Sequence, residues 1–437
     1  MLQLSHPRSV LTIGLALSLG CTTDEASTPT PSAETEGVGE SGTTAVDDGT
    51  ADETAAIDTE AGETDGALPP PTGLFTFSLR IPGRKVLAIA VFADALDEEV
   101  SLELDAGLEI PNNGIAVGPD GDGGVVYTSD GATPRLTEFL VDADGGIEQG
   151  RTVSFEGSIA SANGVAAGNF VFVSPTKAYV VDTIEFNTVV FDPSEMLITG
   201  NFELGDVAES GFFGIIGTRP VLRDGEVVIS LSYLSLGVGF SPLSRLVFID
   251  PDTDQVTQIL EVPDCSALTE LHLADNGDLY AASDVANVTN RLDGRGGGRE
   301  CIVRIPSGEY DVAEEFTYTE LSGGWDGAGL IPLSDTTVFV RVIDPSLVPA
   351  DLQTPAAQLD AWYWAKLDLA DPTTIEIFDD REPRGPSTQH LELGGRRYAT
   401  EISGDFSESR LVDFGTGEPT VGLSAPGVIV NAFRVRM

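Results

Sequence analysis

One pattern recurs along most of this chain, a turn rich in Gly, Asp or Pro followed by a short apolar strand. Seven segments show it, and one residue of each serves as a marker: Val86, Tyr127, Tyr179, Val228, Tyr280, Phe339 and Tyr398. The gaps between successive markers are 41, 52, 49, 52, 59 and 59 residues, within the length of one four-stranded propeller blade and its loops. The repeat therefore predicts an all-β fold, a seven-bladed β-propeller at residues 72–437.

The segments between the markers fit this prediction. "RLVFIDPDTDQVTQIL", "TEFLVDADGGIEQG" and "WYWAKLDLADPTTIEIF" each have two strand patterns around a tight turn, as in the outer hairpin of a blade. No long stretch has a clear 3.6-residue period, so we expect few helices. "FTFSLRI" near one end and "GVIVNAFRVRM" at the other are both strand candidates, and we expect the two to close the ring in one blade.

Two copies of the repeat match closely. "HLADNGDLYA" from His272 and "HLELGGRRYA" from His390 share His, Leu, Gly and Tyr-Ala at the same offsets. We therefore expect both histidines at the same place in their blades, where they would either pack between blades or bind a ligand or metal at the central channel. Acid–base chemistry would need Glu270 beside His272, or Glu392 beside His390, next to a serine.

The first 20 residues are typical of an export signal. Arg8 precedes an apolar run, Val10–Leu19, that is too short to span a bilayer. Ser18-Leu19-Gly20-Cys21 resembles the lipobox of bacterial lipoproteins, although Leu would be expected at the position of Ser18. The resemblance implies cleavage before Cys21 and lipidation of its thiol, which would anchor the chain to a membrane. The alternative is an ordinary signal peptide with an incidental cysteine.

Residues 21–71 are predicted to be a disordered linker. From Thr22 to Leu68 the chain has thirteen acidic residues, no Lys or Arg and no aromatic residue, so it cannot bury enough apolar surface to fold. It would serve either as a stalk or as a solubilising tail. In known lipoprotein sorting patterns, an aspartate directly after the lipidated cysteine is associated with retention at the inner membrane. Thr22 stands at this position here, and by that resemblance we expect an exported protein held at the outer membrane.

Charge limits the partners. The chain has 70 acidic and 23 basic residues, a net charge of -47, which excludes nucleic acid because its binding needs a basic surface. The same charge argues against direct contact of the domain with anionic lipid. The partners left are a membrane, reached through the lipid anchor, and a small ligand or an envelope protein.

Two cysteines remain once Cys21 is assigned to lipid. In an exported chain, Cys265 and Cys301 are predicted to form a disulfide, because the rival interpretation, a metal pair, lacks further ligands nearby. The segment "NRLDGRGGGREC" inside this loop is expected to be the least ordered part of the domain. Its Arg295 and Arg299 are candidates for binding an anionic ligand.

Calcium is the one cofactor that the sequence suggests, and only weakly. Asp250, Asp252, Asp254 and Glu261 stand at offsets 1, 3, 5 and 12 of a calcium loop, but Gln255 occupies the position of the required glycine. A hairpin turn is the favoured interpretation. Among the aromatic residues, the loop tryptophan Trp325 is a candidate for a binding surface, with packing between blades as the alternative.

The lipobox, the acidic linker, "SPTKAYVVDTIEFNTVVFDPSEM" and "CIVRI" resemble surface lipoproteins that myxobacteria encode beside siderophore and iron-uptake functions. The resemblance implies a non-catalytic outer-membrane lipoprotein that assists ferric-siderophore acquisition. We therefore favour a binding or interaction module over an enzyme. The alternatives are a propeller hydrolase or lactonase that uses channel carboxylates and a metal, and a structural surface protein.

Overall fold

The computed structural model describes residues 74–81, 84–88, 107–110, 115–117, 124–129, 133–159, 170–217, 220–371, 375–387, 389–393 and 396–436. Nearly all the regular structure in these ranges is β-strand. The predicted signal peptide, residues 1–20, and the predicted linker, residues 21–71 with Cys21, lie outside the described residues.

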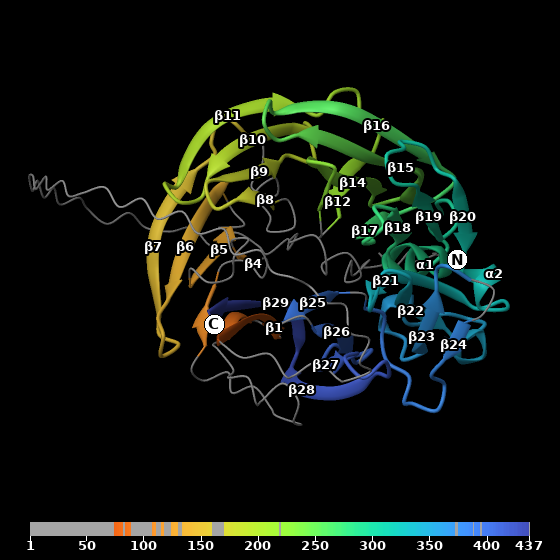
Figure 1. The fold of residues 1–437 in the computed structure, drawn as a ribbon. Helices are drawn as coiled ribbons and strands as arrows, with labels where there is room; N and C mark the ends of the chain where they lie inside the picture. Colours follow the sequence, from red (N-terminus) through yellow and green to blue (C-terminus); the bar gives the residue numbers. More distant parts are fainter. Residues whose placement is uncertain are drawn as a thin grey trace, which may run out of the picture. The chain divides into compact units, whose positions relative to one another are not determined.

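The described strands pair into seven antiparallel sheets, six of four strands and one of five (Figure 1). The first three along the chain contain β29 (Val428–Arg436), β1 (Leu74–Ile81), β2 (Arg84–Ala88) and β3 (Leu108–Glu109); β4 (Ile115–Val117), β5 (Val125–Ser129), β6 (Arg135–Val141) and β7 (Ile147–Ser154); and β8 (Phe170–Ser174), β9 (Lys177–Val181), β10 (Asn187–Asp192) and β11 (Leu197–Glu203). The next two contain β12 (Phe213–Ile216), β13 (Val221–Arg223), β14 (Glu226–Ser235), β15 (Gly239–Asp250) and β16 (Gln255–Pro263); and β17 (Leu268–Leu273), β18 (Leu279–Ser283), β19 (Cys301–Ile305) and β20 (Glu314–Thr317). The last two contain β21 (Asp326–Pro332), β22 (Thr337–Ile343), β23 (Trp362–Asp368) and β24 (Ile375–Ile377); and β25 (His390–Leu393), β26 (Arg396–Ile402), β27 (Glu408–Asp413) and β28 (Thr420–Pro426).

The sheets follow one another around a common centre. Figure 1 shows β29, β4, β8, β12, β17, β21 and β25 nearest that centre and the outer strands β7, β11, β16, β20, β24 and β28 at the rim. Apolar clusters fill the space between neighbouring sheets; one of them joins Tyr179 and Val190 of one sheet to Ile229 and Val247 of the next. The prediction of an all-β propeller is confirmed.

Strands from both ends of the described chain close the ring, as predicted. β1 pairs with β29 from Leu74 opposite Arg436 to Arg80 opposite Val428. Because β29 takes the innermost position, β1 is the second strand of its sheet and β2 the third. The marker Val86 therefore lies on a third strand, whereas the other six markers lie on second strands, and this explains why the first gap in the repeat is the shortest.

An aspartate ends the third strand, or directly follows it, in five of the described sheets. Each carboxylate accepts a hydrogen bond from the backbone N–H two residues further on: Asp142, Asp192, Asp250, Asp368 and Asp413. Such a bond closes a tight turn by replacing a backbone acceptor. Part of the large acidic content therefore has a structural role, and the outer hairpins predicted from the sequence are confirmed.

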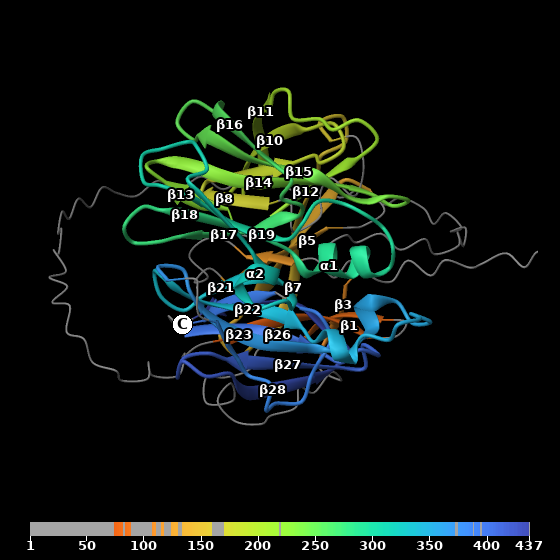
Figure 2. The same ribbon diagram turned by 90° about the vertical axis from the view of Figure 1, so that its right-hand side faces the viewer.

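The ring has two distinct faces. Consecutive strands are antiparallel, so connections from first to second and from third to fourth strand lie on one face, which we call the turn face. Connections from second to third strand, and from each sheet to the next, lie on the opposite face, which we call the loop face. Figure 2 shows α1 (Val285–Leu292) on the loop face and the C-terminal end of the chain on the other side.

The helices in the described ranges are short. Besides α1 they are α2 (Tyr318–Leu321) and the 3-10 helices η4 (Pro345–Leu347) and η5 (Ala356–Gln358). Within these ranges, no helix combines the length and the apolar character needed to cross a membrane.

Candidate functional site

The innermost strands of two sheets bring an acid and a histidine together. Glu270 lies on β17 and His390 on β25, and His390 Nδ1 is 3.8 Å from Glu270 Oε2. The two side chains are only 4% and 2% exposed, so water screens their interaction little. The strand of the intervening sheet, β21, carries the small residues Gly327, Ala328 and Gly329.

The two histidines do not occupy equivalent positions, and the prediction from the repeat is wrong here. His272 pairs with Tyr280 across β17 and β18, whereas His390 pairs with Ala399, one residue beyond Tyr398. A shift of one residue in register turns a side chain to the opposite face of the sheet. His390 therefore faces the preceding sheet and meets Glu270, instead of repeating the environment of His272.

Two further acids, Glu300 and Asp284, interact electrostatically with the buried Tyr318, as Glu270 does. Burial raises the pKa of Tyr318 well above its ordinary value, and the negative charges of Glu270, Glu300 and Asp284 act in the same direction. The Tyr318 hydroxyl donates a hydrogen bond of 2.7 Å to the carbonyl of Gly329. These groups therefore form one electrostatic unit at the boundary between two sheets.

Two of these carboxyl groups are held at α1. Burial raises the pKa of Asp284, which caps the helix by accepting a bond of 2.7 Å from the N–H of Ala286. Burial also raises the pKa of Glu300, although the Arg291 guanidinium, with Nη2 3.3 Å from Glu300 Oε2, opposes the shift. Asn287 Nδ2 donates to Glu300 Oε1 at 3.0 Å. We call these residues, together with Glu270 and His390, the acid–histidine site.

His272 lies toward the turn face. Its Nε2 is 3.3 Å from the carbonyl oxygen of Asp335, in the turn between β21 and β22. Burial lowers the pKa of His272, and the positive charge of Arg397 adds to the shift, while the Asp335 carbonyl opposes it. Glu270 thus pairs with His390 and not with its own neighbour His272. The side chain of Glu392, the other predicted acid, lies outside the described residues.

At mildly acidic pH we expect the wild type to lose stability and His272→Gln to lose less. Because the pKa of His272 is lower in the folded protein than the ordinary value of 6.5, the unfolded chain binds the proton more readily, so stability falls as the pH drops through about 6.5. Urea unfolding of the wild type and of His272→Gln at about pH 7.5 and about pH 5.5 measures how much stability each protein loses.

Asp284 and Glu300 also titrate at acidic pH, and their raised pKa values favour the folded state as the pH falls toward about 4. Both residues are present in the wild type and in His272→Gln, so their effect cancels when the two proteins are compared. A parallel decrease of stability in the wild type and His272→Gln would contradict the assignment to His272.

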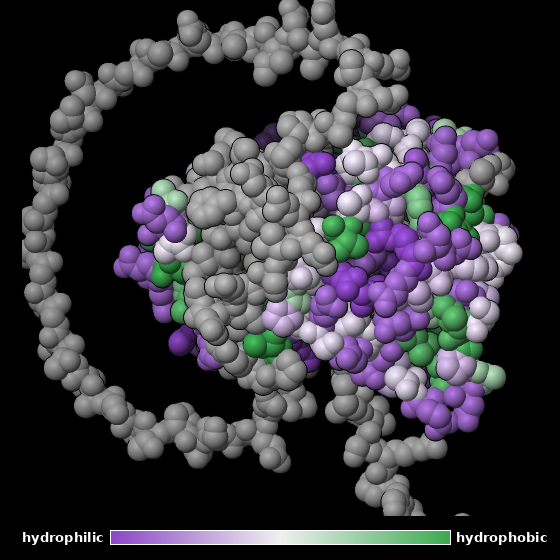
Figure 3. All heavy atoms as spheres, turned by 90° about the horizontal axis from the view of Figure 1, so that it is seen from below, coloured by the Kyte–Doolittle hydropathy of each residue, from purple (hydrophilic) through white to green (hydrophobic). Residues whose placement is uncertain are grey.

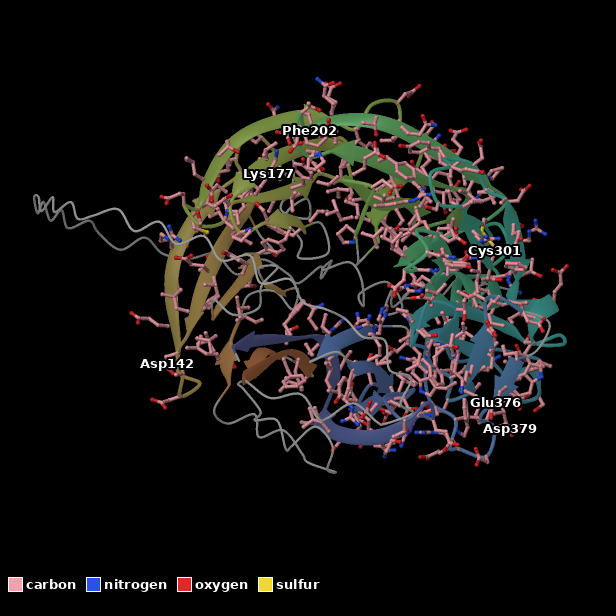
Figure 4. All side chains as sticks on the ribbon, viewed as in Figure 1. Asp142, Lys177, Phe202, Cys301, Glu376 and Asp379 are labelled. Atoms are coloured by element: carbon pink, nitrogen blue, oxygen red, sulfur yellow. A yellow bond between two sulfur atoms is a disulfide. The ribbon has the colours of Figure 1, made fainter. Side chains whose placement is uncertain are left out.

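The aspartates of the calcium-loop pattern form a hairpin turn, as favoured from the sequence. Asp250 accepts from the N–H of Asp252 at 2.8 Å, and Asp254 ends the turn with a φ of 55° before β16. The Asp254 carboxylate lies 2.6 Å from both Lys177 Nζ and the Tyr179 hydroxyl of the neighbouring sheet. Figure 4 labels Lys177 on β9. This turn lies on the turn face, away from the acid–histidine site.

The arginine-rich loop is held in place, contrary to the expectation that it is poorly ordered. The predicted disulfide between Cys265 and Cys301 is confirmed, with a Cα–Cα distance of 5.8 Å (Figure 4). The N–H of Gly298 donates to Ser266 Oγ at 2.6 Å, and the N–H of Ser266 donates to the carbonyl of Arg299 at 3.1 Å. The Arg299 guanidinium pairs with a carboxylate of Glu315, and that of Arg295 pairs with Asp293 at 3.0 Å.

Trp325 lies on the loop face, in the connection between α2 and β21. Its ring is half-buried and 6.1 Å from the ring of Tyr363. The other tryptophans, Trp362 and Trp364, are fully buried in cores. The loop face therefore gathers Trp325, both loop arginines and the acid–histidine site, whereas His272 and the aspartate turn lie at the other end. In the part of the chain that is described, no group of three or more His, Cys, Asp or Glu side chains is arranged to hold a metal ion.

Sequence reasoning missed both the cross-sheet pair and α1. The helix had a local signal, because Asp284 precedes two valines three residues apart, Val285 and Val288, that pack inward. The pair between Glu270 and His390 had no local signal, since it depends on the register of two hairpins.

No family model and no curated protein matches this chain. Among solved structures, a protein of Bacteroides uniformis described as a "putative 6-phosphogluconolactonase" is 12% identical, covers 82% of this chain and 98% of its own, and has a TM-score of 0.50. A Bacteroides fragilis protein with the same description is 12% identical over 80% of this chain and 94% of its own, with a TM-score of 0.48. Apo AztD from Citrobacter koseri is 10% identical over 82% and 99%, with a TM-score of 0.39. At 12% identity, the similarity to the Bacteroides uniformis structure shows a shared fold alone.

Proposed function

We propose that this chain is a lipid-anchored binding protein of the cell envelope, exported and held at the outer membrane through Cys21. Its seven-bladed propeller would be carried on the acidic segment of residues 22–68. The ligand would bind on the loop face.

The observation that carries the proposal is the position of β1 in the closing sheet. β1 is a second strand, so the chain enters the ring at Leu74 on the turn face, opposite Arg436. The loop face, with Trp325 and α1, lies at the opposite end of the sheets. An anchor on the N-terminal side therefore leaves the loop face free to bind.

The ligand class that we propose is a ferric siderophore, on the basis of the resemblance to lipoproteins encoded beside iron-uptake functions. The half-buried ring of Trp325 offers a flat apolar surface. Arg295 and Arg299, already paired with carboxylates, lie on the same face and can exchange those partners for an anionic ligand.

Tryptophan fluorescence of residues 69–437 tests this proposal. We expect saturable quenching by a ferric catecholate siderophore, little response to the iron-free siderophore or to calcium, and weaker quenching in Trp325→Phe. The buried Trp362 and Trp364 remain in that variant and report nonspecific absorption by the coloured complex. Equal quenching of both proteins, or none, would remove the siderophore from the proposal. Acyl labelling of wild-type and Cys21→Ala chains tests the anchor separately.

A hydrolase or lactonase is the second candidate, and the acid–histidine site favours it. A carboxylate and an imidazole are groups that general acid–base catalysis uses, and here the two are buried with Glu270 Oε2 and His390 Nδ1 3.8 Å apart. A lactone belongs in the same titration series for this reason. Hydrolysis of the lactone by the wild type, lost in His390→Gln, would replace the binding proposal with an enzymatic one.

A further inference from the structure

One hairpin on the loop face is longer than the others. β14 and β15 have 10 and 12 residues, whereas the second and third strands of the other sheets have five to eight. β15 ends at Asp250 in the same kind of aspartate turn as the other third strands, so the additional length lies at the loop face. Figure 2 shows this hairpin extending toward the side that carries α1.

The tip of the hairpin is apolar and exposed. Leu236 and Val238 are 59% and 55% exposed, and Gly237 stands between them. The N–H of Val238 bonds to the carbonyl of Ser235 at 3.1 Å, and Gly239 has a φ of 96°, so the tip is a closed turn. Exposing two aliphatic side chains at the end of a projecting hairpin brings no stability to the folded chain, because neither side chain buries its surface there.

The hairpin is braced just below its tip. Phe240 packs with Leu234 and with Ala286 of α1, and Ser266 Oγ donates to the carbonyl of Ser241 at 2.7 Å. Ser266 follows Cys265 of the disulfide. The apolar tip is therefore held by a cross-linked support, and a rigid apolar anchor loses little conformational entropy on binding.

Exposed acidic residues lie in the loop-face connections of the hairpin's own sheet and of the preceding sheet: Glu185, Asp206 and Asp264. The backbone of Arg295 lies against Gly239 at the base of the tip. The basic residues of the adjacent loop, Arg295 and Arg299, each pair with a carboxylate. Figure 3 shows another view of the molecule, on which hydrophilic residues cover most of the visible described surface and apolar residues form separate patches. An apolar anchor among carboxylates complements a segment that is apolar on one side and basic on the other.

We propose that the β14–β15 tip is a docking point for a basic, amphipathic segment of a partner protein. Leu236 and Val238 would enter its apolar side, and the three carboxylates would meet its Lys or Arg residues. The inference rests on the proposed binding function. It adds to that function a second contact on the loop face, made with a partner protein.

Calorimetric titration of the full chain carrying Cys21→Ala tests this inference. The probe is a synthetic helical peptide of Lys and Leu, compared with a peptide of the same pattern in which Glu replaces Lys. Leu236→Ser with Val238→Ser is the test variant. Leu222→Ser is the matched control, because Leu222 is 60% exposed and lies on β13 next to the turn face.

We expect the Lys peptide to bind with an affinity that falls with salt, and the hairpin variant to weaken binding about tenfold while Leu222→Ser leaves it unchanged. The hairpin variant should keep the thermal unfolding of the parent, since its side chains are exposed. Equal loss in both variants, equal binding of the Glu peptide, or no binding would overturn the inference. Acyl labelling at Cys21 and siderophore quenching are independent of this result, so failure of the docking point is distinguishable from failure of the proposed function.

Discussion

Replacing Cys265 and Cys301 together by Ala is expected to lower the free energy of unfolding of the propeller by about 4 kcal/mol. The disulfide closes a loop with a sequence separation of 36 residues, and the loss of chain entropy in the unfolded state predicts an effect of this size. Both cysteines are fully buried in an apolar cluster, so Ala keeps the site apolar. Guanidinium unfolding of residues 69–437 measures the change.

The same variant should show a local effect. The hydrogen bonds that hold Gly298 and Arg299 against Asp264 and Ser266 lie beside the disulfide, so hydrogen exchange should increase there before it increases in β22 or β26. Tyr398→Phe is the control, because it changes a core away from the disulfide and leaves the disulfide intact. A decrease of less than about 1 kcal/mol would mean that packing already restricts the loop, contrary to the entropic account.

Those features of the fold that depend on local chemistry could be predicted from the sequence. The Asp250 hairpin was predictable because an aspartate followed by proline can close its own turn. Closure by β1 and β29 was predictable because both ends carry strong strand patterns and a propeller needs one sheet to join them. The disulfide followed from the number of cysteines left in a chain that the sequence predicts to be exported.

The acid–histidine site could not be predicted, because it depends on register. The repeat places His272 and His390 eight residues before their tyrosine markers. The hairpin of β17 and β18 pairs His272 with Tyr280, but the tighter hairpin of β25 and β26 pairs His390 with Ala399. One residue of difference turns the side chain to the other face of the sheet, and none of the five positions shared by the two ten-residue segments determines the length of the turn.

His390→Ala is expected to lower the free energy of unfolding by about 3 kcal/mol, because it takes the imidazole away from a carboxylate that stays buried. Glu270→Gln in the same chain should recover part of this loss, since the amide carries no charge. A double-mutant cycle should therefore give a coupling of about 1 to 2 kcal/mol between two sheets that are not neighbours in the ring.

His272→Ala supplies the matched control for this cycle. His272 is half-buried and lies two residues from Glu270 on the same strand, but its ring contacts the backbone of Asp335. Its cycle with Glu270→Gln should be additive within about 0.5 kcal/mol. Coupling of equal size for both histidines would mean that Glu270 responds to any nearby change in packing. Coupling to His390 alone would identify a specific interaction between Glu270 and His390, and it would show that these two sheets, which are not neighbours in the ring, stabilise each other through this pair.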